Sequence, residues 1–273
     1  MSAEQPFLTA SWTEMLMLNF AVPGKLIAQL APPGTEPDFF DGQAYVSIVG
    51  FMFRDSRLFG IRFPGHGLFE EVNLRYYVRR RVGDSWRKGV VFVREIAPRP
   101  LVAATARWIY NESYVTRRMR NSVRLAGNSL AAGDDVGYEW RTGRGAKRCW
   151  NRMAGRAAAP LQLPKPGSLT EYIAEHYWAY VRRRDGGTSE YRVAHRPWRV
   201  APAEDVVWDC DLAASYGDTP LAEHLAVPPA LAFVADGSPV QVFRGRRCEE
   251  LPVQRRRPRS VPQLDLTPPI SAA

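Results

Sequence analysis

The sequence predicts a mainly β protein of the α+β class, in which many short strands form a closed or nearly closed structure. Runs of β-branched and aromatic residues recur along the chain and are separated by turn signals, with few helical patterns between them. Aromatic residues make up 11% of the 273 residues, which suits large side chains packed in a β-rich interior. Residues 69–78 alternate polar and apolar side chains with the period of two that is typical of a strand.

The first part of the chain should contain extended segments interrupted at glycine and proline. Trp12–Leu30 is expected to form short helical or extended pieces broken at Pro23-Gly24, and the run Ala44–Phe53 is expected to form a buried strand. The other strands expected here are Leu58–Phe63, which should pair with Leu68–Arg81 across Pro64–Gly67, and Lys88–Ile96 after the turn at Gly83-Asp84.

A helix from Pro98 to Tyr110 should follow, because the first helical turn tolerates proline. Ser168 is a candidate N-cap, and Glu171 completes a capping box for a further short helix. The later strands are expected at Met119–Leu125, Gly137–Thr142, Ala146–Met153, Val206–Leu212, Ala230–Ala235 and Val240–Phe243, with a hairpin of Ala174–Arg183 and Ser189–Ala194 over Asp185-Gly186-Gly187.

Composition limits the class of protein. No run of about 18 apolar residues is present and the N-terminal residues lack a secretory pattern, so we expect no transmembrane helix and no signal peptide. The three cysteines are far apart, which argues for reduced thiols in a cytoplasmic protein, and the four histidines lack metal-ligand spacing. We expect one domain over residues 1–243, a Pro/Arg-rich disordered tail over residues 244–273, no cofactor and no metal.

Several short motifs occur in an order that resembles one known family. They are Ser11-Trp12, Asn19–Pro23, Phe40–Val46, Glu71–Val78, Gly89–Phe92, Ala106-Arg107, Gly167–Leu169 and His195–Trp198. Together they resemble the YqjF-like family of bacterial proteins (domain of unknown function 2071) over about residues 11–235. That family is grouped with the acetoacetate decarboxylase superfamily. The resemblance therefore implies a cone-shaped, mostly antiparallel β-barrel with a few peripheral helices and a ligand cavity inside.

The chain departs from the chemistry that this resemblance implies. The superfamily decarboxylates β-keto acids through a Schiff-base lysine beside a second cation. The strand Val90–Ile96, where such a lysine is expected, contains Arg94 instead, and Lys88 lies next to a turn at its start. A guanidinium stays charged and cannot form an imine. We therefore expect no Schiff-base decarboxylation, and any enzymatic activity should be lyase or proton-transfer chemistry on a small carboxylate.

The main candidate site is the polar face of the strand at residues 69–78. This face carries Glu71, Asn73, Arg75 and Tyr77. It could be solvated, or it could line the inside of a barrel. In a functional interpretation, Arg75 binds a carboxylate or oxyanion, Asn73 orients it, and Glu71 acts as acid or base. In a structural interpretation, Glu71 and Arg75 pair with each other or with strand neighbours.

Two further residues are candidate ligand contacts. Arg107 lies on an otherwise apolar predicted helix, where it could close the cavity mouth or pair with an acid such as Asp41 or Glu95. His195 could be a general base or a donor to a ligand, or it could bond to backbone at a strand end. The structural role is favoured for both. His176 is expected to be half buried in a strand.

Two functions from different classes follow. In the first, the barrel binds a small anionic metabolite. In the second, a non-catalytic protein contacts an acidic partner or nucleic acid through an arginine-rich rim and tail, since the net charge is +9 and arginine triplets occur at 79–81, 182–184 and 255–257. No nucleic-acid-binding motif is present, which argues against nucleic acid. We expect no membrane partner, and exposed strand edges are compatible with a homo-oligomer.

Overall fold

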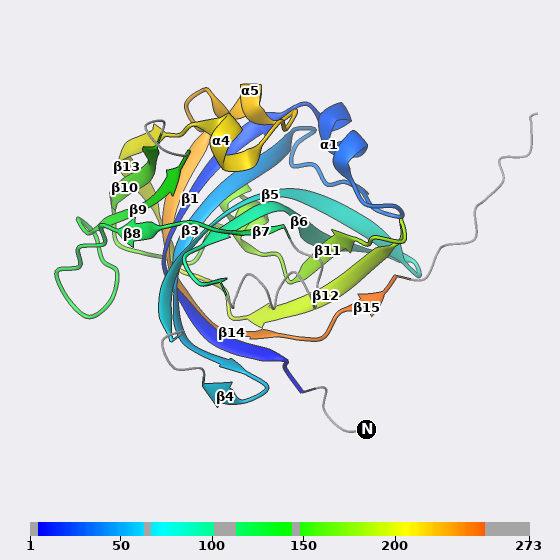
Figure 1. Ribbon diagram of the computed structural model, residues 1–273, viewed down its shortest axis with the longest axis horizontal. Helices are drawn as coiled ribbons and strands as arrows, with labels where there is room; N and C mark the ends of the chain where they lie inside the picture. The colour runs from blue at the N-terminus through cyan, green and yellow to red at the C-terminus, as the bar shows by residue number, and fades with distance from the viewer. Residues whose placement is uncertain (1–4, 63–66, 101–112, 144–147, 249–273) are drawn as a thin grey trace, which may run out of the picture.

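The main feature of the computed structural model is a closed ring of strands, seen in Figure 1. The structure describes residues 5–62, 67–100, 113–143 and 148–248. The ring strands, in spatial order, are β1 (Leu8–Val22), β3 (Ala44–Leu58), β5 (Leu68–Val82), β6 (Ser85–Ala97), β11 (Trp178–Arg182), β12 (Thr188–His195) and β14 (Leu231–Val242). Because β14 pairs with both β12 and β1, the order returns to its start. The prediction of a mainly β, closed structure is confirmed.

The ring is less regular than an antiparallel barrel. Its pairs are antiparallel except at β6–β11, which is parallel and has one registered pair, Ala179 with Val90. The turn between β5 and β6 depends on the conformational freedom of a glycine. Gly83 has φ 58° in the turn between the paired residues Val82 and Ser85, a conformation open to glycine. The predicted turn at Gly83-Asp84 is confirmed.

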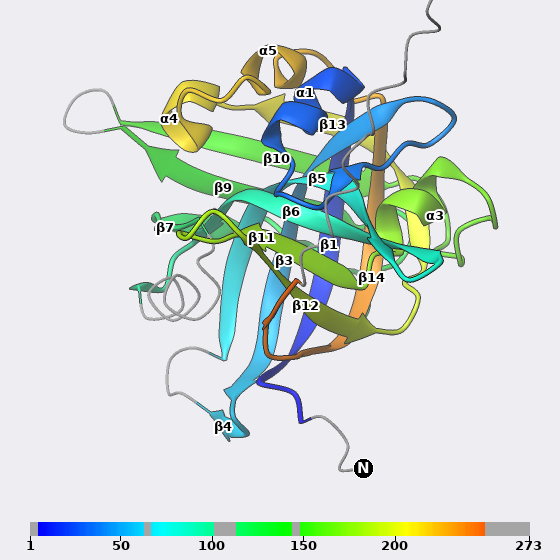
Figure 2. The ribbon, with the colours of Figure 1, turned by 90° about the vertical axis from the view of Figure 1, so that its right-hand side faces the viewer.

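A second layer covers one side of the ring, as Figures 1 and 2 show. Its strands are β8 (Met119–Asn121), β9 (Asp135–Thr142), β10 (Cys149–Ala157) and β13 (Val200–Asp209), and its helices are α1 (Gly24–Leu30), α4 (Leu212–Tyr216) and α5 (Ala222–Leu225). Strand β13 pairs with both β14 and β10, so the second layer continues from the ring wall. The remaining elements are α3 (Leu169–Ala174) and the short strands β2 (Glu36–Pro37), β4 (Ile61–Arg62), β7 (Tyr114–Thr116) and β15 (Arg246–Arg247).

Two apolar cores lie on opposite sides of the ring wall. The outer core fills the space between the ring and the second layer, and it includes Ile48, Leu74 and Trp140. The inner core collects side chains from every ring strand and from α3. Because both faces of the wall are covered, buried residues such as Leu16 and Met17 follow each other without a polar residue between them.

The break expected at Pro23-Gly24 is confirmed, because the extended strand β1 ends at Val22 and the short helix α1 starts at Gly24. Burial of β1 on both faces and a bulge at Glu14 (φ 47°) hide the period of two in this strand. Two other predictions about segments are wrong. Strand β5 pairs with β3 and β6, and β4 instead folds back onto β3 through the turn at Phe59-Gly60. The two segments expected between residues 230 and 243 form the one strand β14.

Other predictions fall between the described ranges or near the end of the last one. The helix expected at residues 98–110 falls mostly outside them. After residue 243 the chain continues as β15, in which Arg246 lies opposite Glu190 of β12. The tail was expected to begin at residue 244, which lies before the last described residue, Cys248. Across the ranges that the structure describes, no helix is long and apolar enough to cross a membrane.

Close packing of the second layer on the ring predicts the effect of a substitution at Gly50. A Cβ atom at Gly50 lies 2.4 Å from Cδ2 of Tyr138 and 3.0 Å from Sδ of Met153. Gly50→Val should therefore lower the free energy of unfolding by about 1–3 kcal/mol, measured by urea denaturation. The control Gly67→Ala, where a Cβ atom meets nothing within 4 Å, should change it by less than about 0.5 kcal/mol. Equal effects of the two substitutions contradict this packing.

Candidate functional site

The polar face of β5 points into the ring. Its residues Glu71, Asn73, Arg75 and Tyr77 have exposed fractions of 2%, 4%, 7% and 1%. Tyr77 packs in the inner core, whereas the intervening residues Val72, Leu74 and Tyr76 belong to the outer core. The structure therefore shows that this polar face lines the inside of the ring and is not exposed to solvent. Ring closure removes this polar face from bulk water.

Two neighbouring strands support the centre of this polar face. Arg75 lies opposite Ser47 of β3, and Ser47 lies opposite Asn19 of β1. The Ser47 hydroxyl donates to Oδ1 of Asn19 at 2.6 Å and lies 2.5 Å from the Tyr77 hydroxyl. Nδ2 of Asn19 donates to the Leu231 carbonyl of β14 at 3.0 Å. These bonds join the ring wall and hold the Tyr77 ring in place.

Glu71 is a buried acid that accepts two side-chain hydrogen bonds. Its Oε2 accepts a hydrogen bond from the Tyr114 hydroxyl at 2.8 Å, and its Oε1 accepts one from Nδ2 of Asn73 at 3.4 Å. Burial raises the pKa of Glu71 from 4.5 to about 7, and these two hydrogen bonds oppose the rise. A carboxyl group with this pKa exchanges its proton near neutral pH, which suits a general acid or base.

Arg75 carries a buried charge that no acid neutralises within the described residues. One Nη2 hydrogen bond goes to the Ile173 carbonyl at 3.1 Å, and the same nitrogen lies 3.9 Å from Sδ of Met17. The guanidinium carbon is 5.6 Å from the centre of the Tyr77 ring. Nε of Arg75 has no hydrogen-bond partner there. Glu71 and Arg75 do not pair, so the guanidinium has donors left for an anion.

Helix α3 supplies the carbonyl that Arg75 contacts. Oγ of Ser168 accepts from the Glu171 amide at 3.2 Å, which confirms the predicted N-cap. The Glu171 carboxylate accepts from the Gly167 amide at 2.7 Å, one residue before the position that a capping box uses. The cap sets where this short helix starts, and its last turn brings Ile173 to Arg75.

His176 lies beside Arg75, although its sequence context predicts a half-buried strand residue. It is 7% exposed and lies between α3 and β11, with its ring 4.8 Å from the Tyr77 ring and 5.5 Å from the Tyr172 ring. One ring nitrogen lies near the Ile173 carbonyl, but neither makes a well-formed hydrogen bond with a described residue. Burial, with Arg75 and Lys88 nearby, lowers the pKa of His176 to about 3, so the imidazole is neutral. The sequence signal that could have pointed to His176 is its position two residues after the helix that Ser168 caps.

Of the other two predicted ligand contacts, His195 lies next to this cluster, where the His176 backbone and the charge of Arg75 act on its imidazole. His195 is stacked between the rings of Trp198, at 4.2 Å, and Tyr177, at 4.6 Å. Its Nδ1 lies 2.9 Å from the Arg196 carbonyl, which matches the expected backbone contact at a strand end. Burial lowers the pKa of His195. Arg107 lies outside the described residues.

No lysine among the described residues places its amine beside Arg75 on the inner face. Nζ of Lys88 lies 3.7 Å from the Asp38 carboxylate and 5.3 Å from the centre of the Tyr172 ring, and its side chain is 54% exposed. Arg94 points to the second layer, where it donates to the Ser215 carbonyl at 3.1 Å. A charged, half-exposed lysine held by an acid is a poor imine-forming amine.

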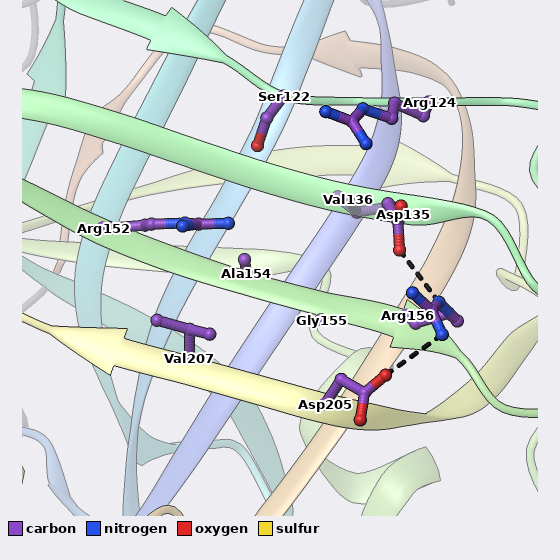
Figure 3. Close-up of a pocket in the computed structure, with 10 residues that line it drawn as sticks. All are labelled: Ser122, Arg124, Asp135, Val136, Arg152, Ala154, Gly155, Arg156, Asp205 and Val207. Carbon is purple, nitrogen blue, oxygen red and sulfur yellow. Dashed lines mark hydrogen bonds and ion pairs between the residues drawn. The ribbon is translucent and has the colours of Figure 1, made fainter.

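A groove of about 290 Å³ lies on the second layer, over β9, β10 and β13 (Figure 3). Arg156 crosses it between Asp135, at 3.0 Å, and Asp205, at 3.1 Å. These opposite charges compensate each other on the open surface, where ion pairs contribute little. Arg124 and Arg152 also line the groove, but both side chains are exposed to solvent, whereas Arg75 is buried.

The inner cluster of Glu71, Asn73, Arg75 and His176 supports anion binding next to an acid–base group. Arg75 supplies positive charge, while Glu71 and Asn73 lie further along the same strand face. No group of histidine, cysteine, aspartate and glutamate side chains in the described ranges is arranged to hold a metal ion. The polar atoms present suit an organic anion better than a cation.

Comparison with solved structures shows an acetoacetate decarboxylase-like fold. The enduracididine biosynthesis enzyme MppR in complex with pyruvate aligns with a TM-score of 0.59 and 14% identity, over 90% of this chain and 91% of that chain. An acetoacetate decarboxylase-like enzyme from Sphingomonas wittichii RW1 aligns with a TM-score of 0.59 and 15% identity, over 92% and 95%. The acetoacetate decarboxylase of Legionella pneumophila aligns with a TM-score of 0.59 and 8% identity, over 91% and 90%.

Comparison of sequences places the chain in a family. It belongs to the DUF2071 family, described as "Uncharacterized conserved protein (COG2071)", whose model matches residues 9–239. A curated relative, the uncharacterized protein YqjF of Bacillus subtilis (strain 168), is 26% identical over 195 residues, which cover 71% of this chain and 75% of YqjF. The family resemblance carried by the sequence motifs is confirmed.

The raised pKa of Glu71 predicts a pH-dependent stability. Because the folded state binds the Glu71 proton more tightly, the free energy of unfolding should fall as pH rises from 4.5 through about 7. Glu71→Gln should remove this penalty, making the variant more stable than the wild type by up to about 3 kcal/mol at pH 8 and similar to it below pH 4.5. Urea denaturation at several pH values measures the difference.

The matched control for this experiment is Glu70→Gln. Glu70 is the neighbouring residue on the opposite face of β5, where it accepts a hydrogen bond from Asn121. This substitution should leave the slope of stability against pH as in the wild type. A wild type whose stability does not fall between pH 5 and pH 8 relative to Glu71→Gln contradicts the assigned pKa direction.

Proposed function

We propose that this protein binds a small organic anion, of the carboxylate class, inside the ring of strands, with Arg75 as the binding residue. The observation that carries the proposal is the buried Arg75 guanidinium, which contacts one carbonyl oxygen and no acid of the described residues. Burying a charge without a partner opposes folding. Proteins keep such a group where a ligand completes its hydrogen bonds.

Glu71 gives the proposed site acid–base capacity. Its carboxyl group lies on the same face of β5 as Arg75 and has its pKa raised to about 7. Burial keeps the proton on Glu71 for part of the time, which lowers the repulsion between this carboxyl group and a bound anion. Proton transfer to or from a bound carboxylate is therefore the reaction class that we assign to the site, if it has an activity.

Ligand-induced stabilisation tests the binding proposal. We choose pyruvate, acetoacetate and related carboxylates as probes, because the fold is shared with MppR, which binds pyruvate in one of its structures, and with acetoacetate decarboxylase. At a concentration of about 100 times Kd, a ligand should raise the free energy of unfolding by about 2.7 kcal/mol. Arg75→Met should abolish this effect for every probe, measured by thermal unfolding.

The free protein distinguishes a binding role of Arg75 from a structural one. If the charge is kept for a ligand, Arg75→Met should be at least as stable as the wild type without ligand, because it removes an unpaired buried charge. The control Arg79→Met removes a guanidinium on the same strand that is paired with Glu36 at 2.7 Å and should keep the ligand response. A screen without any stabilising carboxylate, or an unchanged response in Arg75→Met, contradicts the proposal.

A reduction experiment tests the absence of Schiff-base chemistry. Borohydride traps an imine between a lysine and a keto acid as a stable secondary amine. Treatment of the protein with pyruvate or acetoacetate and borohydride should leave its mass unchanged, because Lys88 is held by Asp38 outside the Arg75 cluster. A mass increase located at Lys88 by peptide mapping refutes this prediction.

The arginine-rich rim stays a prediction of the sequence. Among the rim arginines, Arg79 stacks on Trp86 at 4.3 Å and pairs with Glu36, Arg80 lies 3.7 Å from the buried Glu190, and Arg183 pairs with Asp185. The triplet at 255–257 lies outside the described residues. Deleting residues 249–273 should leave carboxylate binding intact, and salt-sensitive binding of an acidic partner that depends on these residues would favour the second function.

A further inference from the structure

We propose that His176 contacts the ligand directly and that the ligand is a carboxylate carrying an oxo or hydroxyl group near the carboxylate. The inference rests on the proposed function, because it assigns a second polar contact to the ligand that Arg75 binds. It adds to that function a residue and a chemical requirement. The argument depends on which polar atoms of the inner face have no partner.

The inner face holds several buried polar atoms that the described residues leave without hydrogen bonds. They are Nε of Arg75, Oδ1 of Asn73 and both ring nitrogens of His176, one of which lies near the Ile173 carbonyl without bonding to it in good geometry. The side chains that bear them are 7%, 4% and 7% exposed, respectively. Buried polar atoms are normally paired, and a buried atom left without a partner costs the free energy of its lost hydration. Several such atoms facing one interior indicate a shared ligand.

The local backbone places His176 next to Arg75. Ile173, in the last turn of α3, accepts the Arg75 hydrogen bond, and His176 follows three residues later. The His176 ring packs against Tyr77, which is two residues after Arg75 on the same face of β5. The charge of Arg75 also acts on His176 and helps to keep its imidazole neutral. A ligand group that reaches Arg75 therefore lies close to the imidazole.

The chemistry of a neutral imidazole decides which group it contacts. It has one N–H donor and one acceptor nitrogen, and it lacks the charge needed to bind a second anionic group. An oxo group accepts from the N–H, and a hydroxyl group can either donate or accept. Arg75 takes the carboxylate as the charged donor. The pair therefore fits a 2-oxo or hydroxy acid better than a plain fatty acid.

Packing alone does not explain a histidine at this position. The His176 ring lies between the rings of Tyr77 and Tyr172 in a mainly apolar core, so a phenylalanine fills a similar volume without unpaired nitrogens. For a purely structural role, His176→Phe should therefore be neutral or stabilising and should change ligand binding uniformly. For a ligand contact, the same substitution should change the selectivity among ligands.

The test compares three-carbon acids that differ at one carbon atom. Dissociation constants of pyruvate, lactate and propionate are measured for the full chain by calorimetry or by thermal shift against concentration. The wild type should bind pyruvate and lactate about tenfold more tightly than propionate, the expected effect of one hydrogen bond from a buried group. In His176→Phe the propionate constant should stay within about twofold, and the preference should disappear.

Further variants separate this effect from loss of folding. His176→Gln keeps an amide donor and acceptor and should retain part of the preference, while His176→Met provides a second apolar replacement if the Phe variant does not fold. His224→Phe, on α5 in the second layer, should keep the full preference. Equal binding of pyruvate, lactate and propionate to the wild type, or a preference that persists in the Phe and Met variants, overturns the inference but leaves the proposed function intact. Failure of all carboxylates to bind contradicts both.

Discussion

The contact between the Arg75 guanidinium and the Ile173 carbonyl determines how the inside of this ring is organised. The last carbonyls of a helix lack intrahelical partners, and the Ile173 carbonyl near the end of α3 is satisfied by Arg75 at 3.1 Å. Besides a contact with Sδ of Met17, this bond is the hydrogen bond that the described residues give to the buried charge of Arg75. This single hydrogen bond links α3 to β5, and it leaves the buried charge of Arg75 without an acid among the described residues. The Ser168 cap contributes by setting where this helix begins.

The electrostatics of the inner face follow from burial. Glu71 and His176 both lose charge inside the ring, because burial raises the pKa of the carboxyl group and lowers that of the imidazole. The guanidinium of Arg75 stays charged under any ordinary condition. The inner face therefore offers an anion the charge of Arg75 and the neutral imidazole of His176, while Glu95 is a further buried acid opposite Asn73. On the outer groove, in contrast, Arg156 is compensated by two aspartates.

Local patterns predicted the elements whose chemistry is contained in a few neighbouring residues. The Ser168 cap, the turn at Gly83-Asp84 and the β11–β12 hairpin over Asp185-Gly186-Gly187 are all present. The failures occur where tertiary packing overrides the local signal. Strand β4 pairs with β3 and not with β5, because a turn at Phe59-Gly60 redirects the chain. His176 was missed as a site residue because its partners come from β5 and α3.

By itself, the sequence determined that Glu71, Asn73, Arg75 and Tyr77 share one face, since alternation is a property of any extended backbone. It also determined the mainly β class and the family. Only the tertiary structure decided that this face looks inward, because that depends on β14 pairing with both β1 and β12. It also decided that Arg75 bonds to a carbonyl oxygen, lies near the His176 imidazole and pairs with no carboxylate of the described residues. Long-range pairing creates those neighbours, and no periodicity within a single strand encodes them.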